Sequence, residues 1–257
     1  MSEADPSGEH HILVEVGDGI QTIRLNRLEK KNAITRAMYR RMAEALTEGD
    51  GDPAVRVHLL LGLPGVFSAG NDLADFVSVA AGGDVGQDVW DFLAALAAAE
   101  KPLVSAVDGI AVGVGATIHL HCDLTFATPR TVFRTPFIDL GLVPEAGSSL
   151  LAPRLMGHQR AFALLALGEG MTAEEALAAG LIYRVVSERE VEEAAREAAT
   201  ALAAKPPVAL KIARDLIRGP REAILARIRE EGDHFAARLR SPEAAQAFAA
   251  FMGRKKA

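Results

Sequence analysis

The pattern of apolar and polar positions predicts that the fold begins with an antiparallel hairpin. Residues 12–16 and 21–26 are rich in β-branched side chains, and the Gly17-Asp18-Gly19 segment between them is typical of a tight turn. A helix is expected next, from about residue 35 to residue 48, and it should pack against the sheet. Its apolar side chains recur at four-residue spacing: Met38, Met42 and Leu46.

The middle of the chain repeats one order of elements, in which a buried strand is followed by a loop and a helix. Residues 55–61 predict a strand and residues 62–70 predict a loop, after which a helical region extends to about Ala99. Residues 103–107 predict a second buried strand. An apolar stretch of helical length follows from residue 113 towards residue 120.

The last part of the chain changes character after two short predicted strands, at residues 124–127 and 131–134. Beyond them nearly every pattern is helical. The whole chain therefore predicts an α/β fold of repeated strand-strand-helix units with a helical C-terminal region. Helix starts are marked by two expected capping boxes and one N-cap followed by proline: Thr172 with Glu175, Ser187 with Glu190, and Ser241-Pro242.

Composition and charge narrow the classes of function. The 257 residues are 49% apolar and 24% charged, which fits one globular domain, and the net charge of −6 argues against nucleic acid as a partner. Cys122 is the single cysteine, so no intrachain disulfide can form. The apolar run at 109–118 is too short for a membrane span, and residues 1–9 lack the pattern of a secretory signal. We expect a cytoplasmic protein without a membrane partner.

Familiar nucleotide and metal motifs fail when their spacing is checked. Gly113-x-Gly115 lacks the third glycine of a dinucleotide fingerprint, since Ile118 stands there. A phosphate-binding loop starting at Gly65 would need lysine where Asn71 stands. The His119-x-His121 pair is a weak candidate for a metal, because residues i and i+2 of a helix point apart, and packing explains it better. No metal site is predicted.

Two glycine-containing segments, residues 67–73 and residues 108–117, each connect a strand to a predicted helix. Small residues let a ligand approach the backbone, and a helix start directs N–H groups at negative charge. Together the segments predict a two-donor oxyanion hole for the charge that develops on a thioester oxygen during enolate chemistry. Taken singly, each has a structural alternative, a tight turn for the first and close helix packing for the second.

Several ordered motifs resemble those of the crotonase (enoyl-CoA hydratase/isomerase) superfamily over about residues 10 to 255. The resemblance implies a spiral of strand-strand-helix units over residues 1–200 and a helical trimerisation region over residues 201–257. It also implies an acyl-CoA thioester substrate, no separate cofactor, and a homotrimer or dimer of trimers. The motifs are Leu25-Asn26-Arg27 with Asn32-Ala33, the segment Phe67-Ser68-Ala69-Gly70-Asn71-Asp72-Leu73, Ala106-Val107-Asp108-Gly109 followed by Gly113-Val114-Gly115, and Leu140-Gly141-Leu142-Val143-Pro144.

The resemblance places the two oxyanion-hole amides on Asn71 and Val114. The second position is usually glycine in the family, so we expect the bulk of Val114 to narrow the pocket beside the thioester. Family hydratases use two glutamates to add water, and Thr117 and Phe137 stand at those positions here. Neither can act as a carboxylate, which argues against an ordinary hydratase.

Glu145 is the one acid where chemistry is expected. Apolar and small neighbours should desolvate its carboxylate and raise its pKa towards the range of a general base. The segment around it resembles the peroxisomal-type Δ3,Δ2-enoyl-CoA isomerase branch, in which a single glutamate moves the proton. The alternative is that Glu145 is a first-turn acid of a helix that begins near Ser148.

Further residues are expected to contact the substrate. Arg27, Lys30 and Lys31 are candidates for the CoA phosphates, although a solvated basic turn explains them equally well. Phe251 could close the acyl or CoA groove, or it could simply pack between helices. Five residues of the glycine-containing segments are expected around the thioester: Ala69, Gly70, Asp72, Leu73 and Gly113.

The preferred interpretation is an isomerase that shifts the double bond of a 3-enoyl-CoA to the 2-position, with Glu145 as acid and base. One alternative is an enoyl-CoA hydratase or another crotonase-type thioester enolate enzyme that uses a second acid, such as Asp75 or Asp139. Another is a non-catalytic acyl-CoA-binding protein on the same fold. Formation of a 3-hydroxyacyl product would identify the hydratase, and binding without turnover would identify the third alternative.

Overall fold

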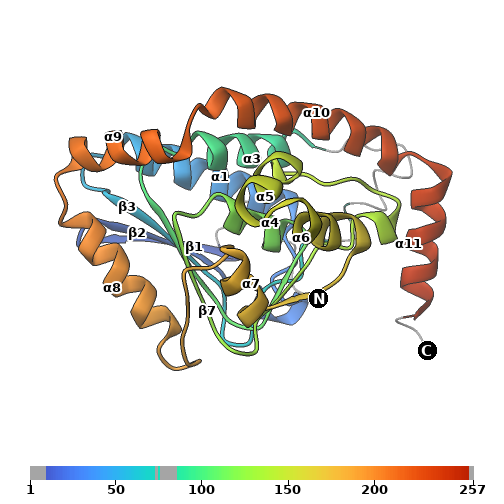
Figure 1. Cartoon of the computed structure of the whole chain (residues 1–257), viewed down its shortest axis with the longest axis horizontal. Coiled ribbons are helices and arrows are strands. Elements are labelled where there is room, and N and C mark those ends of the chain that lie inside the picture. The colour runs from blue at the N-terminus through green and yellow to red at the C-terminus, as the bar shows by residue number, and fades with distance from the viewer. Residues whose placement is uncertain (1–9, 73–74, 76–85, 255–257) are drawn as a thin grey trace.

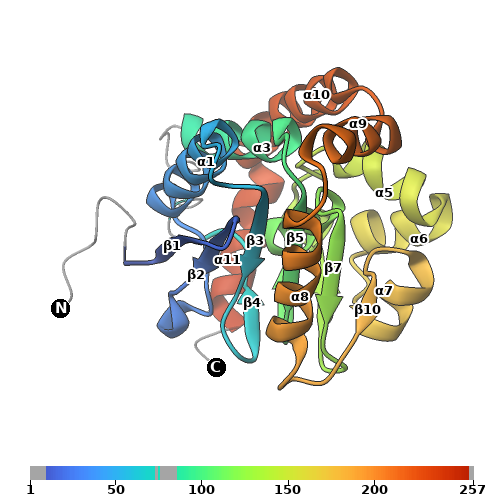
Figure 2. The ribbon, with the colours of Figure 1, turned by 90° about the vertical axis from the view of Figure 1, so that its left-hand side faces the viewer.

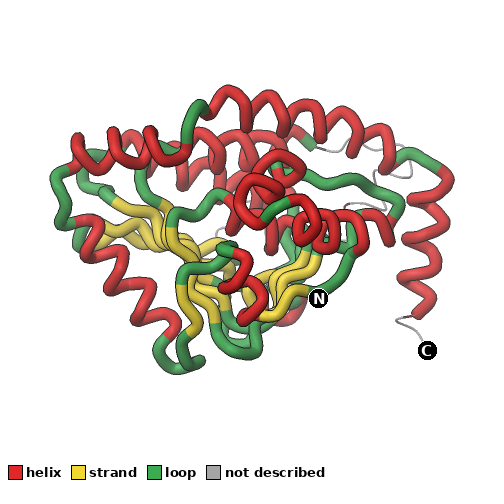
Figure 3. The backbone as a smooth tube through the Cα atoms, viewed as in Figure 1, coloured by secondary structure: helices red, strands yellow, loops and turns green. Residues whose placement is uncertain are grey.

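The computed structural model describes residues 10–72, 75 and 86–254, and the side chains of that part through residue 250. Within this part, the strands form a six-stranded and a four-stranded sheet, and helices surround both (Figures 1 and 3). None of the helices in these described ranges has the length and apolarity that a membrane span needs.

The larger sheet begins with the predicted hairpin. β1 and β2 are antiparallel, with Ile12 opposite Leu25, and the following strands pair in parallel. The order across the sheet is β1-β2-β3-β5-β7-β10. These strands are β1 (Ile12–Gly17), β2 (Ile20–Leu25), β3 (Val57–Leu61), β5 (Leu103–Val107), β7 (Leu124–Ala127) and β10 (Arg184–Val185).

The smaller sheet has the order β4-β6-β8-β9, and its strands alternate along the chain with those of the larger one. β3 leads into β4, β5 into β6 and β7 into β8, and this alternation produces the expected spiral of strand-strand-helix units. The prediction of a plain loop at 62–70 was wrong, because β4 lies inside it, and β6 was also missed. The strands are β4 (Val66–Ser68), β6 (Ile110–Val112), β8 (Val132–Arg134) and β9 (Met171–Thr172).

Alternating side chains of the larger sheet build the core on its two faces. Leu60 of β3 belongs to the main cluster with apolar residues of α1 and α3, whereas Leu59 and Leu61 pack with α8 on the opposite face. Figure 2 shows α8 in front of β3, β5 and β7. These helices are α1 (Arg36–Gly51), α3 (Gln87–Ala98) and α8 (Val191–Ala203).

Shorter helical segments follow the strand pairs and connect the sheets to the C-terminal helices. The Thr172–Glu175 capping box is present at the start of α7, as predicted. The shorter helical segments are η1 (Leu28–Lys30), α4 (Val114–Thr117), η2 (Ile118–Leu120), η3 (Ile138–Leu140), α5 (Ser148–Met156), α6 (His158–Phe162), η4 (Ala163–Leu167) and α7 (Ala173–Ala179).

The C-terminal region is helical, as predicted, and consists of α9 (Pro207–Arg218), α10 (Arg221–Leu239) and α11 (Pro242–Arg254). α10 runs across α3 and α5, and α11 turns down along the edge of the molecule beside η3 (Figure 1).

Ser241 caps α11 as predicted. Ser187 and Glu190 were wrongly expected to form a capping box: their side chains bond to each other, but α8 begins only at Val191. The predicted division after residue 200 falls within α8 and stays a prediction.

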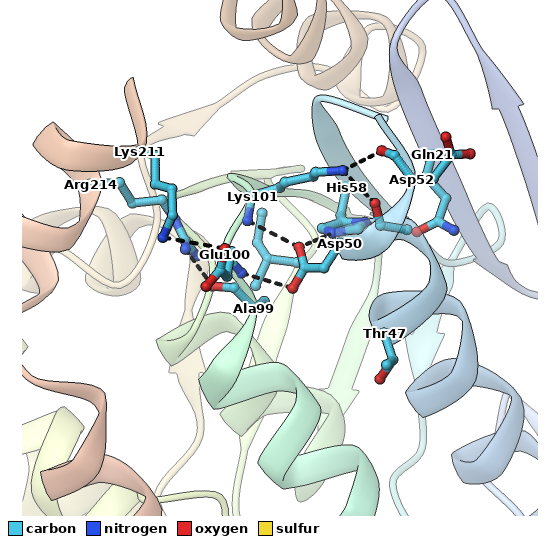
Figure 4. Close-up of polar contacts among 12 residues, drawn as sticks. Gln21, Thr47, Asp50, Asp52, His58, Ala99, Glu100, Lys101, Lys211 and Arg214 are labelled. Atoms are coloured by element: carbon cyan, nitrogen blue, oxygen red, sulfur yellow. Dashed lines mark hydrogen bonds and ion pairs between the residues drawn. The ribbon is translucent and has the colours of Figure 1, made fainter. Parts of the chain in front are cut away.

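Asp50, near the end of α1, forms hydrogen bonds with the residues that precede β5. Its carboxylate bonds to Nε2 of buried His58 at 3.1 Å and accepts the backbone N–H groups of Glu100 and Lys101 at 2.8 and 3.1 Å (Figure 4). The Lys101 ammonium in turn donates to the carbonyls of Gly49 and Asp52, where α1 ends. One partly buried carboxylate thus joins the end of α1 to the sheet.

Candidate active site

The two glycine-containing segments lie against each other in the structure. A Cβ on Gly70 would come within 2.7 Å of the carbonyl oxygen of Val112, and a Cβ on Gly115 would come within 2.8 Å of the Cβ of Ser68. Only glycine permits this approach at both points. The separate signals in the sequence therefore belong to one site.

The amides of Asn71 and Val114 are the free donors at this junction. Neighbouring groups are paired: Ile34 donates to the Gly70 carbonyl, Asp72 donates to the Ile34 carbonyl, and Gly113 donates to the Arg134 carbonyl. Val114 opens α4, where an N–H has no intrahelical acceptor. In the part of the chain that the structure describes, neither amide donates to a backbone acceptor.

The expected narrowing of the pocket by Val114 is wrong. Its side chain is fully buried in the main hydrophobic core and does not line the cavity beside the site. Val114 stands at the start of α4, and its side chain points into the core. The usual glycine is therefore not required for space at this position.

Glu145 is a buried carboxyl group, with only 2% of the residue exposed. Its pKa is raised to about 8: burial is the largest cause, the hydrogen bond from Thr117 opposes the rise, and the negative charge of Glu231 adds to it. The Thr117 hydroxyl donates to Oε1 of Glu145 at 2.6 Å. The predicted upward shift of the pKa is therefore present, and it has the predicted cause.

The turn after Glu145 is held in an unusual backbone conformation. Ala146 and Gly147 have φ values of +61° and +69°, and the first of these is uncommon for a residue with a Cβ. Nε2 of buried His121 lies 2.7 Å from the Ala146 carbonyl, and the Gly147 N–H donates to Glu231 at 2.6 Å. Each residue of the turn thus bonds to one buried side chain.

Glu231 takes the position that the alternative explanation gave to Glu145. Its carboxylate accepts the N–H groups of Gly147 and Ser149, at the start of α5. The Glu145 carboxyl instead bonds to Thr117 on α4. Glu145 is therefore not the acid that stabilises this helix start.

Tyr39 is a member of the site that the sequence did not indicate. Its hydroxyl donates to Oδ1 of Asn71 at 2.5 Å, and the ring is 1% exposed. Burial, followed by the charges of Glu145 and Asp75, raises its pKa well above the usual value. Tyr39 lies on α1 at a position that reads as core, so only its neighbours in space reveal it.

A cavity of about 940 Å³ opens beside the two segments. Glu145 is not among the described residues that line the cavity. Asn71 does line it and accepts the hydrogen bond from Tyr39, whose pKa the charge of Glu145 raises. Ala247 and Ala250 of α11 form part of the opposite wall. Of the residues expected to contact substrate, the lining includes Ala69, Gly70, Asp72, Gly113, Lys30 and Lys31.

Arg27 has a different role from the two lysines. Its guanidinium donates to Asp72 at 2.7 Å and to the Ala33 carbonyl at 2.9 Å, and it is not among the described residues that line the cavity. Arg134 does line it, although the sequence did not single it out. Leu73 and the Phe251 side chain lie outside the described residues.

Thr117 and Phe137, which by the resemblance stand where hydratases carry glutamates, both lie near the site, but neither supplies a carboxylate. Thr117 holds Glu145, and Phe137 lines the cavity. Of the two alternative acids, Asp139 lines the cavity, whereas Asp75 accepts the backbone N–H of Arg36 at the start of α1. Burial raises the pKa of Asp75.

The chain matches the model of the enoyl-CoA hydratase/isomerase family over residues 15–257. It is 36% identical over 250 residues to enoyl-CoA delta isomerase 2 of Rattus norvegicus, covering 95% of this chain and 64% of the rat protein. It is 35% identical over 212 residues to 1,2-epoxyphenylacetyl-CoA isomerase of Escherichia coli (strain K12), covering 80% of this chain and 81% of that protein. The chain thus spans just under two thirds of the rat relative.

A solved structure is also similar over nearly the full length. OdaA of Pseudomonas aeruginosa superimposes with a TM-score of 0.90 at 45% identity, covering 94% of this chain and 98% of that one. The family match, these relatives and the alternating strands of the two sheets agree. The chain belongs to the enoyl-CoA hydratase/isomerase family.

Proposed function

We propose that the protein is an acyl-CoA isomerase that converts a 3-enoyl-CoA into a 2-enoyl-CoA. The observation that carries the proposal is the single buried carboxyl group of Glu145, whose pKa of about 8 suits both uptake and return of a proton near neutral pH. Asn71 and Val114 supply two amides for the thioester oxygen. The rat and bacterial relatives, which are named as isomerases, also favour isomerisation.

Glu145 acts first as base and then as acid in this proposal. It removes a proton from C2, and the electrons of that C–H bond move towards the thioester carbonyl to form a dienolate. The Asn71 and Val114 amides stabilise the negative oxygen. The electrons then return to form the C2–C3 double bond, and C4 takes the proton back from Glu145. Atoms and charge balance without water, metal or redox cofactor.

The cations at the cavity mouth are proposed to bind the phosphates of CoA. Lys30 and Lys31 line the cavity, which supports this role for them. Arg27 is engaged by Asp72, so we propose that it stabilises the loop that carries Asn71. The substrate thus enters with its nucleotide end at η1 and its thioester at the glycine-containing segments.

A trimer, or a dimer of trimers, is proposed as the assembly. α9 supports this because apolar side chains lie exposed along it: Val208 is 69%, Leu216 is 79% and Ile217 is 85% exposed. Apolar faces of this kind mark protein interfaces. The cytoplasmic location stays a prediction, and one relative is named as peroxisomal.

The alternative with one supporting observation is hydration. Asp139 lines the cavity and could supply a second carboxylate. A hydratase would convert a 2-enoyl-CoA into a 3-hydroxyacyl-CoA, whereas the proposed isomerase leaves no oxygen on the acyl chain. Stable binding of CoA thioesters without either product would instead indicate a non-catalytic binding protein.

The first experiment compares the wild type with Glu145→Gln on a 3-enoyl-CoA in deuterated water. We expect 2-enoyl-CoA from the wild type and at least a hundredfold lower kcat in the variant, because general acid-base catalysis contributes about 10²–10⁴-fold. Mass spectrometry and NMR of the thioester measure the product and the position of any deuterium. Equal rates for the two proteins would exclude Glu145 as the base.

A further inference from the structure

The turn that carries Glu145 depends on a side chain from the far end of the chain. Glu231 on α10 is 5% exposed, and its two carboxylate oxygens accept the N–H groups of Gly147 and Ser149 at 2.6 and 2.9 Å. A helix start with free N–H groups is a favourable place for a carboxylate. Glu231 is therefore anchored at both oxygens.

This contact fixes a backbone that would otherwise be unfavourable. Ala146 and Gly147 both lie in the left-handed region, and a Cβ on Gly147 would meet Ile224 of α10 at 3.2 Å. Strained backbone at such positions persists only when the surroundings determine it. His121 and Glu231 hold this backbone conformation through their bonds to Ala146 and Gly147.

We propose that Glu231 is a positioning residue, which fixes the turn that carries Glu145 and sets how readily Glu145 exchanges its proton. The inference rests on the proposed function, in which Glu145 is the acid and base. It assigns Glu231 no contact with substrate, because Glu231 is not among the described residues that line the cavity.

The charged groups around the pair define the expected effect. Glu145 faces Thr117 of α4 and Glu231 of α10, and its own charge acts on Tyr39 of α1. Burial raises the pKa of Glu231 as well, while its bonds to Ser149 and Gly147 and the charge of Arg227 on α10 oppose the rise.

His121 faces the turn after Glu145 as a neutral group. Burial lowers its pKa to about 4, and the nearby charges of Arg218 and Arg214 also favour the neutral ring. Above that pH, His121 does not add a positive charge to the site. Among the described residues, Glu231 is the one carboxylate whose negative charge raises the pKa of Glu145.

The test uses two variants with opposite expectations and one matched control. Glu231→Gln removes the charge and keeps one of the two accepting oxygens, so the titration midpoint of Glu145 should move to lower pH. Thr117→Val removes the bond to the ionised carboxylate, so the midpoint should move to higher pH. Glu230→Gln is the matched control, because Glu230 is the preceding residue of α10 and its side chain is 62% exposed.

The readout is carbon NMR of protein labelled at the glutamate carboxyl carbons, with Glu145→Gln identifying the Glu145 signal. This measurement needs no turnover, so it remains valid if the isomerase proposal fails. In the kinetic arm, the acid limb of kcat against pH should follow the same shifts. Glu231→Ala, which loses both bonds, should lower kcat about tenfold with KM changed less than twofold.

Coincident Glu145 midpoints in the wild type, Glu231→Gln and Glu230→Gln would overturn the inference. So would a Glu231→Ala variant that folds, as judged by circular dichroism, and retains the wild-type kcat. If Glu231→Gln does not fold, Glu231→Asp serves as the second variant. It keeps the charge but shortens the reach, so it should leave kcat nearer the alanine value than the wild-type value.

Discussion

At the scale of single residues, Glu145 combines a function with a cost. A carboxyl group that is 2% exposed loses hydration when it ionises, and the Thr117 hydroxyl compensates only in part. The same desolvation that raises the pKa of Glu145 towards neutral pH, as the proposed base needs, therefore weakens the folded state when Glu145 carries a charge.

The stability of Glu145→Gln is expected to show this cost directly. The folded pKa of about 8 lies above the reference value of 4.5, so the unfolded state releases a proton in that interval and wild-type stability falls as pH rises through it. Gln does not titrate, so the variant should melt above the wild type at pH 9, with the gap closing towards pH 5. Calorimetry from pH 5 to 9 measures it.

A matched control is the exposed Glu169, changed to Gln. Its melting temperature should follow the wild type across the whole pH range. If Glu145→Gln and Glu169→Gln behave alike, then the Glu145 carboxyl group is not desolvated in the folded protein, and the pKa argument for catalysis fails with it.

The sequence singled out Asn71 and Glu145 as candidates but missed Tyr39 and Glu231, which contact Asn71 and the turn after Glu145. Asn71 and Glu145 stand in local patterns of glycine, proline and small residues, which a linear reading can find. Tyr39 acts on Asn71 across 32 positions, and Glu231 acts on Gly147 across 84. Tyr39 and Glu231 do not stand out within their own helices, because the residues that they contact are distant in the sequence and only the fold brings them close.

At the scale of elements, strand length decided what the sequence could predict. β3 and β5 have five residues each, all of them buried and most of them apolar, as expected for strands buried on both faces. β4 and β6 have only three residues, too few for a pattern to differ from a loop. Yet these short strands position the two glycine-containing segments, so the least predictable elements carry the site.

The contact between α1 and β5 should depend on Asp50. Bonds from His58 and the Glu100 and Lys101 amides lower its pKa below the usual 3.8, despite an opposing effect of burial. Asp50→Asn should therefore cost about 1–3 kcal/mol of unfolding free energy at pH 7. Because the native pKa is depressed, this contribution exists above pH 4 and is lost as pH falls further.

Urea denaturation at pH 7 and at pH 3 measures that difference. Asp91→Asn provides the control, since Asp91 is exposed on α3 and bonds only to Gln87 of its own helix among the described contacts. A cost for Asp50→Asn that is equal at both pH values would show that the network does not depend on ionised Asp50.

At the scale of the whole molecule, α9 presents apolar side chains that the described part of the chain leaves exposed. Its polar side holds Arg214, which bonds to Asp123 and to the Ala99 carbonyl, while Leu216 and Ile217 point to solvent. A surface that is firmly anchored on one side and apolar on the other is suited to a permanent contact between copies.

Leu216→Asp should weaken the proposed assembly. A charge at a buried interface position costs at least about 1.4 kcal/mol, or a tenfold change in the association constant. Sedimentation velocity over a range of concentrations should show a shift from trimer towards monomer. Val16→Asp, at a half-exposed apolar position on β1, should leave the distribution unchanged. A wild type that sediments as a monomer at all concentrations would contradict the assembly.

The bond between Glu231 and the turn at Gly147 also has a consequence for synthesis on the ribosome. The catalytic turn emerges 84 residues before the side chain that fixes it. At about 5–20 residues per second, that interval lasts about 4–17 seconds. Both sheets can be complete by then, since β10 ends at Val185. The two sheets of the nascent protein can therefore form before Glu231 is available, and a chain cut short before α10 would keep both sheets while lacking the bond that fixes the turn after Glu145.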